Sequence, residues 1–244
     1  MTVGLFIPCY IDQFYPSVGI ATLELLEKAG CRVECHSSQT CCGQPMANSG
    51  FASMTTGCNR NFISSFSRYD YIVAPSGSCV LHIKEHLHDH EQQEAAAGIR
   101  SRTFELTQFF TDVLKIESLE AFFPYKVGFH SGCHGQRMLG LSSSSELVEK
   151  PFSKAAMLLK GVKGLQLFNP ERVDECCGFG GTFCVTEEAV SVAMGRDRIE
   201  EHEANGVDYI TGGDSSCLMH LEGILKRKKS RIRIIHLAEI LNSK

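Results

Sequence analysis

The triplet Cys-Cys-Gly occurs twice in this sequence, as Cys41-Cys42-Gly43 and as Cys176-Cys177-Gly178. Each triplet lies between two further cysteines, and two sets of four recur in the same order: Cys9, Cys41, Cys42 and Cys79, then Cys133, Cys176, Cys177 and Cys217. Matching cysteines lie 124 residues apart at the start of the sets (133 − 9) and 138 apart at their end (217 − 79). A pattern that occurs twice indicates a duplication rather than a solenoid, which needs at least three units. We therefore expect two domains, 1–120 and 121–244.

Short apolar runs of strand length alternate with longer runs of helical periodicity around each triplet. In the first half we expect strands at Val3–Pro8, Cys31–His36 and Tyr71–Ala74, and helices at Ser17–Ala29, Phe51–Arg68 and Cys79–His90. In the second half we expect strands at Lys126–His130, Leu165–Phe168 and Tyr209–Thr211, and helices at Pro151–Lys160, Glu187–Asn205 and Cys217–Lys228. Two apolar segments, Ile232–Ile235 and Leu237–Leu241, close the chain. The segment Phe104–Leu114 is expected to bridge the two halves.

This alternation predicts an α/β fold of two repeated Rossmann-like βα units, whose parallel sheets are related by pseudo-two-fold symmetry. In parallel sheets, ligands bind beyond the carboxyl ends of the strands. Each cysteine of the two sets follows a predicted strand. The pattern therefore predicts one ligand site in each half of the chain.

Composition limits the classes of protein to which the chain can belong. Cysteine makes up 12 of the 244 residues, and the formal net charge is −4. A chain without a basic surplus gives no reason to expect a nucleic-acid partner. No apolar run approaches the roughly 18–20 residues of a membrane span, and the apolar run Val3–Ile7 lacks the basic residues that precede a signal sequence. We expect a cytoplasmic protein, whose reduced cysteines bind metal or carry redox chemistry rather than form disulfides.

The repeated cysteines suit a metal centre. Adjacent residues on a regular strand point to opposite faces, but a glycine with positive φ lets a turn bring both sulfurs of a Cys-Cys pair to one side. Cys79 and Cys217 are predicted at helix N-termini, where the helix dipole favours a thiolate, and His82 and His220 follow them on the same helical face. Each half thus offers four thiolates and one imidazole, a set typical of zinc or an iron–sulfur cluster. We expect the other cysteines to be packing residues, and these are Cys31, Cys35, Cys58 and Cys184.

On these motifs the sequence resembles the cysteine-rich CCG-domain proteins. That group includes the cysteine-rich component of heterodisulfide reductase and the iron–sulfur subunits of glycolate oxidase and anaerobic glycerol-3-phosphate dehydrogenase. Longer stretches are similar to the lactate-utilization protein A family, and these are Gln39–Pro45, Asn48–Gly50, Cys176–Phe183 and Ser216–Met219. The resemblance extends over the whole chain.

The resemblance implies an iron–sulfur oxidoreductase component that works with a ferredoxin-type iron–sulfur protein and a third subunit. Together they would oxidise L-lactate to pyruvate without a nicotinamide cofactor. It also implies one [4Fe–4S] cluster in each repeat, which five cysteines hold in heterodisulfide reductase. This sequence has His82 and His220 in place of the fifth cysteine. A four-cysteine cubane, a cluster with one imidazole ligand, and zinc in one repeat all stay open.

Three further residues are candidates for the chemistry of the substrate. Oxidation of a 2-hydroxy acid needs a base for the hydroxyl proton and an acceptor for the electrons. His130 and His134 flank Cys133, so either could be the base, and Arg137 could clamp the substrate carboxylate. Other functions also fit the motifs: a module that zinc stabilises for partner binding, a glycolate-type subunit, or a disulfide oxidoreductase that uses the Cys-Cys pairs.

Overall fold

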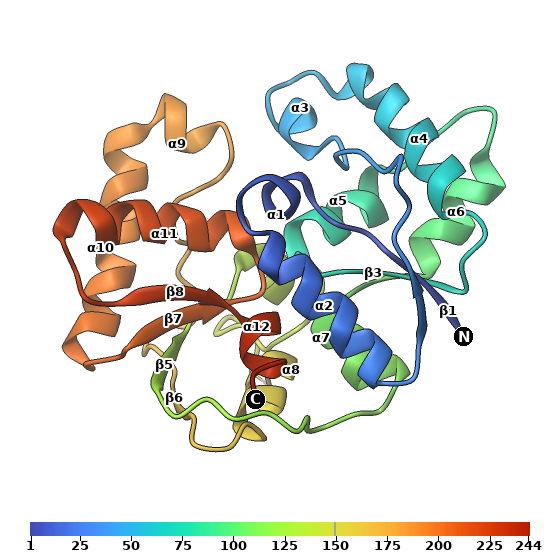
Figure 1. Cartoon of the computed structure of the whole chain (residues 1–244). Helices are drawn as coiled ribbons and strands as arrows, with labels where there is room; N and C mark the ends of the chain where they lie inside the picture. Colours follow the sequence, from blue (N-terminus) through green and yellow to red (C-terminus); the bar gives the residue numbers. More distant parts are fainter. Residues whose placement is uncertain (149) are drawn as a thin grey trace. The chain divides into compact units, whose positions relative to one another are not determined.

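The structure, a computed structural model, describes residues 1–148 and 150–244. These residues divide into two compact units, Met1–Leu114 and Lys115–Lys244 (Figure 1). Each unit contains one four-stranded parallel sheet, with strand order β2-β1-β3-β4 in the first and β6-β5-β7-β8 in the second. The repeated strand order confirms the predicted α/β fold with two similar βα units.

The first unit contains strands β1 (Thr2–Leu5), β2 (Arg32–Glu34), β3 (Tyr71–Ala74) and β4 (Thr103–Glu105). Its helices are α1 (Cys9–Phe14), α2 (Pro16–Lys28), α3 (Gln44–Asn48), the 3-10 helix η1 (Ala52–Thr55), α4 (Thr56–Phe66), α5 (Gly77–His86), α6 (Gln93–Ser101), α7 (Leu106–Gln108) and the π-helix η2 (Phe109–Val113).

The second unit contains strands β5 (Lys126–Phe129), β6 (Gln166–Phe168), β7 (Tyr209–Gly212) and β8 (Arg233–His236). Its helices are the π-helix η3 (His134–Met138), α8 (Lys154–Lys160), α9 (Phe183–Thr186), α10 (Glu188–Ala204), α11 (Ser215–Lys228) and α12 (Leu237–Leu241). Among the described residues, none of the helices has the length and apolar character required to cross a bilayer.

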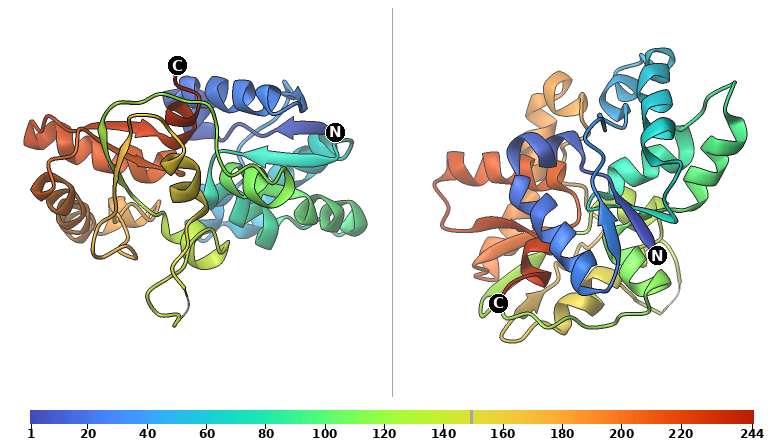
Figure 2. Two further views of the ribbon diagram at one scale, coloured as in Figure 1. Left: turned by 90° about the horizontal axis from the view of Figure 1, so that it is seen from below. Right: turned by 45° about the vertical axis from the view of Figure 1, so that its right-hand side comes forward.

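The middle strands of each sheet are apolar because helices cover them on both faces. Val3 and Leu5 of β1, and Ile72, Val73 and Ala74 of β3, have no exposed surface. Near-continuous apolar runs of this kind are typical of parallel strands in α/β proteins. Figure 2 shows α2, in blue, on one face of the first sheet, with the green helices that follow β3 on the other. The covered sheet leaves the carboxyl ends of its strands as the edge on which a site can be built.

The sequence predicted that Phe104–Leu114 bridges the two halves. This prediction is wrong, because the segment belongs to the first unit. Phe104 belongs to β4, which pairs with β3 and forms the edge of the first sheet. The carboxylate of Glu105 then accepts hydrogen bonds from the backbone N–H groups of Thr107 and Gln108 and so begins α7. A three-residue strand is too short to show an alternating pattern, so its pairing leaves no signal in the sequence.

A glycine at the same place in β1 and β5 reveals how closely the two units match. A Cβ atom on Gly4 would lie 2.3 Å from the ring of Tyr69, and one on Gly128 would lie 2.2 Å from the ring of His202. In each unit a ring therefore packs directly on the backbone of a central strand. The ring is a phenol in the first unit and an imidazole in the second, so the second unit is the more polar at this position.

Candidate metal centres

All eight repeated cysteines lie in the segments that follow the carboxyl ends of strands. Cys9 begins α1 after β1, the Cys41-Cys42 pair follows β2, and Cys79 lies in the first turn of α5 after β3. In the second unit, Cys133, the Cys176-Cys177 pair and Cys217 follow β5, β6 and β7 in the same way. In the order β2-β1-β3-β4, the chain runs from β1 to the strand on one side and from β3 to the strand on the other, and such a reversal of strand order is where α/β sheets bind ligands.

The Cys-Cys-Gly turn directs backbone amides at the first sulfur of each pair. Gly43 and Gly178 have φ of 92° and 90°, in the left-handed region that glycine tolerates. The Gly43 N–H donates to the Sγ atom of Cys41 at 3.5 Å, and the Gly178 N–H donates to Sγ of Cys176 at 3.4 Å. A hydrogen bond donated by an amide to a sulfur favours the thiolate form of that sulfur, and the thiolate is the form that binds a metal.

The four thiols of the first unit are in contact with one another. The Sγ atoms of Cys9 and Cys41 are 3.6 Å apart. Hydrogen bonds from Cys42 and then Cys9 lower the pKa of Cys41, whereas the bond to Cys41 raises the pKa of Cys9. Cys42 is buried and also reaches Cys79, and these two contacts together with burial raise its pKa. The set forms one continuous group around the thiolate of Cys41.

The second unit repeats this arrangement. Hydrogen bonds from Cys133 and Cys177 lower the pKa of Cys176, and the contact with Cys176 raises the pKa of Cys133. Cys177 is 1% exposed, and its contacts with Cys176 and Cys217 raise its pKa. Interaction with Cys177 and then with His130 lowers the pKa of Cys217 to about 7. Here too the four predicted cysteines form one group.

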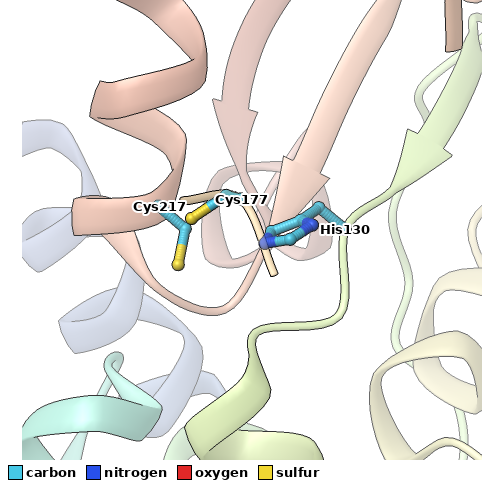
Figure 3. Close-up of side chains that lie close together, drawn as sticks. All are labelled: His130, Cys177 and Cys217. Atoms are coloured by element: carbon cyan, nitrogen blue, oxygen red, sulfur yellow. The ribbon is translucent and has the colours of Figure 1, made fainter. Parts of the chain in front are cut away.

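One residue in contact with the second set is His130. Its ring and the sulfurs of Cys177 and Cys217 offer ligand atoms that all lie within 4.8 Å of one another. Figure 3 shows a ring nitrogen of His130 directed toward the two cysteines. The sequence predicted His130 as a candidate base, and its proximity to Cys177 and Cys217 was not predicted. Comparison of the two repeats supplies a signal for it, because Phe6 occupies the matching position in the first unit.

The predicted histidine ligands differ between the units. His82 is 5% exposed, and its Nε2 atom makes no hydrogen bond within the described residues. Desolvation lowers the pKa of His82 to about 4, so its neutral ring could offer a lone pair to a metal. In contrast, the Nε2–H of His220 donates to the Ser191 carbonyl at 3.2 Å, and a further hydrogen bond joins the ring to the backbone of Cys177. The ring of His220 therefore holds the Cys-Cys-Gly turn in place through hydrogen bonds to the backbone.

The other two candidates for substrate chemistry lie in η3. Nδ1 of His134 is 3.8 Å from the Sγ atom of Cys133, and the ring is partly exposed. Arg137 is already paired, because its Nη2 atom lies 2.9 Å from the Glu146 carboxylate and its Nη1 donates to the Asp174 carbonyl at 3.1 Å. The side chain of Arg137 is 37% exposed. A substrate carboxylate at Arg137 would have to compete with Glu146.

The four cysteines outside the two sets have separate surroundings. Cys31 is buried, as a packing residue should be, but Cys35 is exposed, so the packing prediction is wrong for Cys35. Cys58 and Cys184 are half-buried, and Cys184 donates to the Gly181 carbonyl at 3.0 Å. Cys35 is the most accessible of these four thiols.

The residues of each set fit a metal or an iron–sulfur centre. Their chemistry is right, because four thiols converge with amides directed at one sulfur. Thiolates on one tetrahedral zinc ion lie about 3.8 Å apart, given Zn–S bonds of about 2.3 Å, which is close to the 3.6 Å between Cys9 and Cys41. Thiolates on the different irons of one cluster lie further apart, so a cluster requires these side chains to spread.

Comparisons with known proteins identify the family of this chain. The family model of the cysteine-rich domain named CCG matches residues 3–84 and 127–222. Lactate utilization protein A from a Geobacillus species is 42% identical to the chain and covers 100% of both proteins. The proteins of the same name from Geobacillus thermodenitrificans and Halalkalibacterium halodurans are 41% and 42% identical, over 99% of this chain and 99% and 97% of their own. Among solved structures, an aspartate racemase homologue from Pyrococcus horikoshii aligns with a TM-score of 0.34 at 11% identity, over 99% of this chain and 95% of its own.

Proposed function

The chain belongs to the lactate utilization protein A family of cysteine-rich-domain proteins, and from this we propose that it is the iron–sulfur component of a system that oxidises L-lactate to pyruvate without NAD. One observation carries the proposal: in each unit, four cysteines from three strand ends converge into one group of thiols. Two such groups in one chain suit electron transfer, since the oxidation of lactate releases two electrons and two protons.

The chain's own residues hold and tune the centres. Cys9, Cys41, Cys42 and Cys79 would hold one [4Fe–4S] cluster, and the matching set in the second unit would hold another. A cluster bound there supplies one-electron acceptor chemistry. Burial of Cys42 and Cys177 keeps water away from one side of each group, while the amides of Gly43 and Gly178 stabilise negative charge on sulfur. These contacts support clusters tuned by the protein rather than exposed to solvent.

The proposed function requires other proteins. The letter A in the family's name and the resemblance to heterodisulfide reductase support a system of several proteins, which we propose to be cytoplasmic. We propose a ferredoxin-type iron–sulfur protein as the electron partner and a third subunit that completes the complex. The substrate is a small 2-hydroxy acid, and the family name favours lactate over glycolate.

The centre in each unit is tested by metal analysis of the full chain after anaerobic purification. We expect a brown protein with about four irons and about four inorganic sulfides per unit, as [4Fe–4S] clusters require. Stoichiometric zinc without sulfide would instead favour a structural module, a possibility that the 3.6 Å between the Cys9 and Cys41 sulfurs also supports. Activity that survives removal of all metal but is lost on alkylation would favour a thiol–disulfide enzyme.

We propose His134 as the base and Arg137 as the carboxylate clamp, since His134 is more exposed to a substrate than the buried His130. His134→Ala and Arg137→Ala should each slow lactate oxidation by the reconstituted complex, with a loss of about 10²–10⁴-fold for the base. The iron content of both variants should stay at the wild-type level. Arg172→Ala is the matched control, because Arg172 is also exposed and paired with a glutamate, Glu175. Wild-type rates in both variants would refute these roles.

A further inference from the structure

We infer that the two cysteine sets hold unlike centres, because His130 is a nitrogen ligand of the second centre, whereas no group of three such ligand atoms among the described residues includes the ring of His82 in the first unit. The inference rests on the proposed metal-binding function and deepens it. It assigns His130 a place in the centre rather than a part in proton transfer from the substrate.

The geometry around His130 is that of a ligand. Its ligand nitrogen and the sulfurs of Cys177 and Cys217 all lie within 4.8 Å of one another, which is a span that one metal ion can bridge. A ring nitrogen of His130 is directed at these two sulfurs (Figure 3). The three residues come from the ends of β5, β6 and β7, so they converge from three separate strands.

Burial makes an unbound nitrogen at this position costly. His130 is 3% exposed, its Nε2 atom has no nitrogen or oxygen partner within the described residues, and its ring interacts with the side chain of Cys217. Buried polar atoms are nearly always satisfied by a partner, and a buried polar atom left without one destabilises the fold. Coordination to a metal would satisfy Nε2 and would account for a polar ring at this depth.

The first unit has a phenyl ring at the equivalent position. Phe6 and His130 each follow the last residue of the first strand and lie three residues before the first cysteine. Their backbones make the same bond: the Phe6 N–H donates to the Val73 carbonyl at 2.9 Å, and the His130 N–H donates to that of Thr211 at 2.8 Å. The two positions are therefore equivalent in space as well as in sequence.

The surroundings of Phe6 leave no room for a nitrogen donor there. Phe6 has no exposed surface and packs edge-on against Phe62 and Phe66, with ring centroids 5.0 and 5.8 Å apart. The second unit is also polar at a neighbouring position. Thr211 occupies the position that Val73 occupies in the first unit, and both residues are fully buried. The first set is backed by an aromatic cluster and the second by an imidazole.

Unlike ligands imply unlike reduction potentials. Where the neutral imidazole of His130 would take the place of one thiolate on iron, the second centre would carry less negative charge than a centre held by four thiolates, and such histidine ligation raises the potential of iron–sulfur centres. The second centre therefore has the higher potential and is reduced first. Electrons that enter the chain would collect at the second set of cysteines.

The test uses the full chain, loaded with iron and sulfide under anaerobic conditions. Potentiometric titration followed by electron paramagnetic resonance should resolve two midpoint potentials, and pulsed measurements on protein labelled with ¹⁵N-histidine should detect nitrogen coupling in the centre of higher potential. His130→Phe, which installs the residue of the first unit, should abolish that coupling and lower only the higher potential. The matched control, Phe6→Leu, should leave the coupling and the order of the potentials unchanged.

Two further measurements decide the remaining outcomes. If His130→Phe loses the iron of the second set, His130→Cys should restore that iron. The restored centre should have a lower potential than the wild-type second centre and no nitrogen coupling. If both variants fold but lack that iron, the inference is overturned. Iron-loaded wild type without nitrogen coupling, or coupling that persists in His130→Phe, would also overturn it. If the wild type holds zinc and no iron, the proposed function fails, and cobalt substitution then tests His130 as a ligand. Absorption bands typical of mixed nitrogen and sulfur ligands, lost in His130→Phe, would support the inference. Bands typical of sulfur ligands alone would refute it.

Discussion

Cys177→Ser should remove the metal of the second unit while the first unit keeps its own, so that the chain retains about half of its iron. Cys177 is 1% exposed and contacts both Cys176 and Cys217, so its loss breaks the group at its centre. A serine hydroxyl cannot replace it, because the thiolate is the ligand and a hydroxyl stays protonated near pH 7. Iron and sulfide analysis of the purified chain measures the effect.

The reciprocal variant and a control complete this prediction. Cys42→Ser should remove the metal of the first unit by the same reasoning, because Cys42 is buried between Cys41 and Cys79. Cys35→Ser changes an exposed cysteine outside both sets and should leave the iron content unchanged. If either Cys42→Ser or Cys177→Ser lost all of the iron, metal binding at one set would depend on the other set, contrary to our expectation.

Gly178→Ala should destabilise the second unit and prevent metal from binding there. Gly178 has φ of 90°, and a Cβ atom would lie 2.5 Å from the Ser191 carbonyl oxygen and 2.9 Å from Cβ of Met194. The positive φ and the overlap each cost on the order of 1–3 kcal/mol, so we expect the free energy of unfolding to fall by about 2–6 kcal/mol. Urea denaturation of the metal-free protein measures this loss, and iron analysis measures the loss of binding.

Two other glycines make this prediction specific. Gly43→Ala should be milder, because the nearest atoms to its Cβ, 3.2 Å away, belong to the Thr55 side chain rather than to backbone. Gly223 lies inside α11 with nothing within 4 Å of an added Cβ, so Gly223→Ala should raise stability by up to about 1 kcal/mol. Equal losses in Gly178→Ala and Gly43→Ala would argue against the steric explanation.

Much of the fold could be predicted from the sequence because the central strands are strongly apolar. The expected strand Tyr71–Ala74 has the bounds seen in the structure. The predicted first residue of a helix was less accurate where a capping side chain determines where the helix begins. The expected helix Pro151–Lys160 begins at Lys154, because the hydroxyl of Ser153 accepts a hydrogen bond from the Ala156 N–H.

The candidate site was predictable in its cysteines but not in the contacts of its histidines. Order and spacing alone grouped the eight cysteines, because parallel strands bring their carboxyl ends to one edge. The directions of side chains depend on packing that no local pattern records. His220 and His82 share a motif, yet Ser191 holds only His220, and the reach of His130 to Cys177 depends on three strands far apart in sequence.

The order of the cysteines along the chain has a consequence for biosynthesis. The first set ends at Cys79, and 54 residues (133 − 79) separate it from the first cysteine of the second set. At about 5–20 residues per second, a ribosome needs about 3–11 s to cross that interval. The thiols of the first unit are therefore all translated before Cys133, so the first set is complete in the growing chain before any thiol of the second set is made.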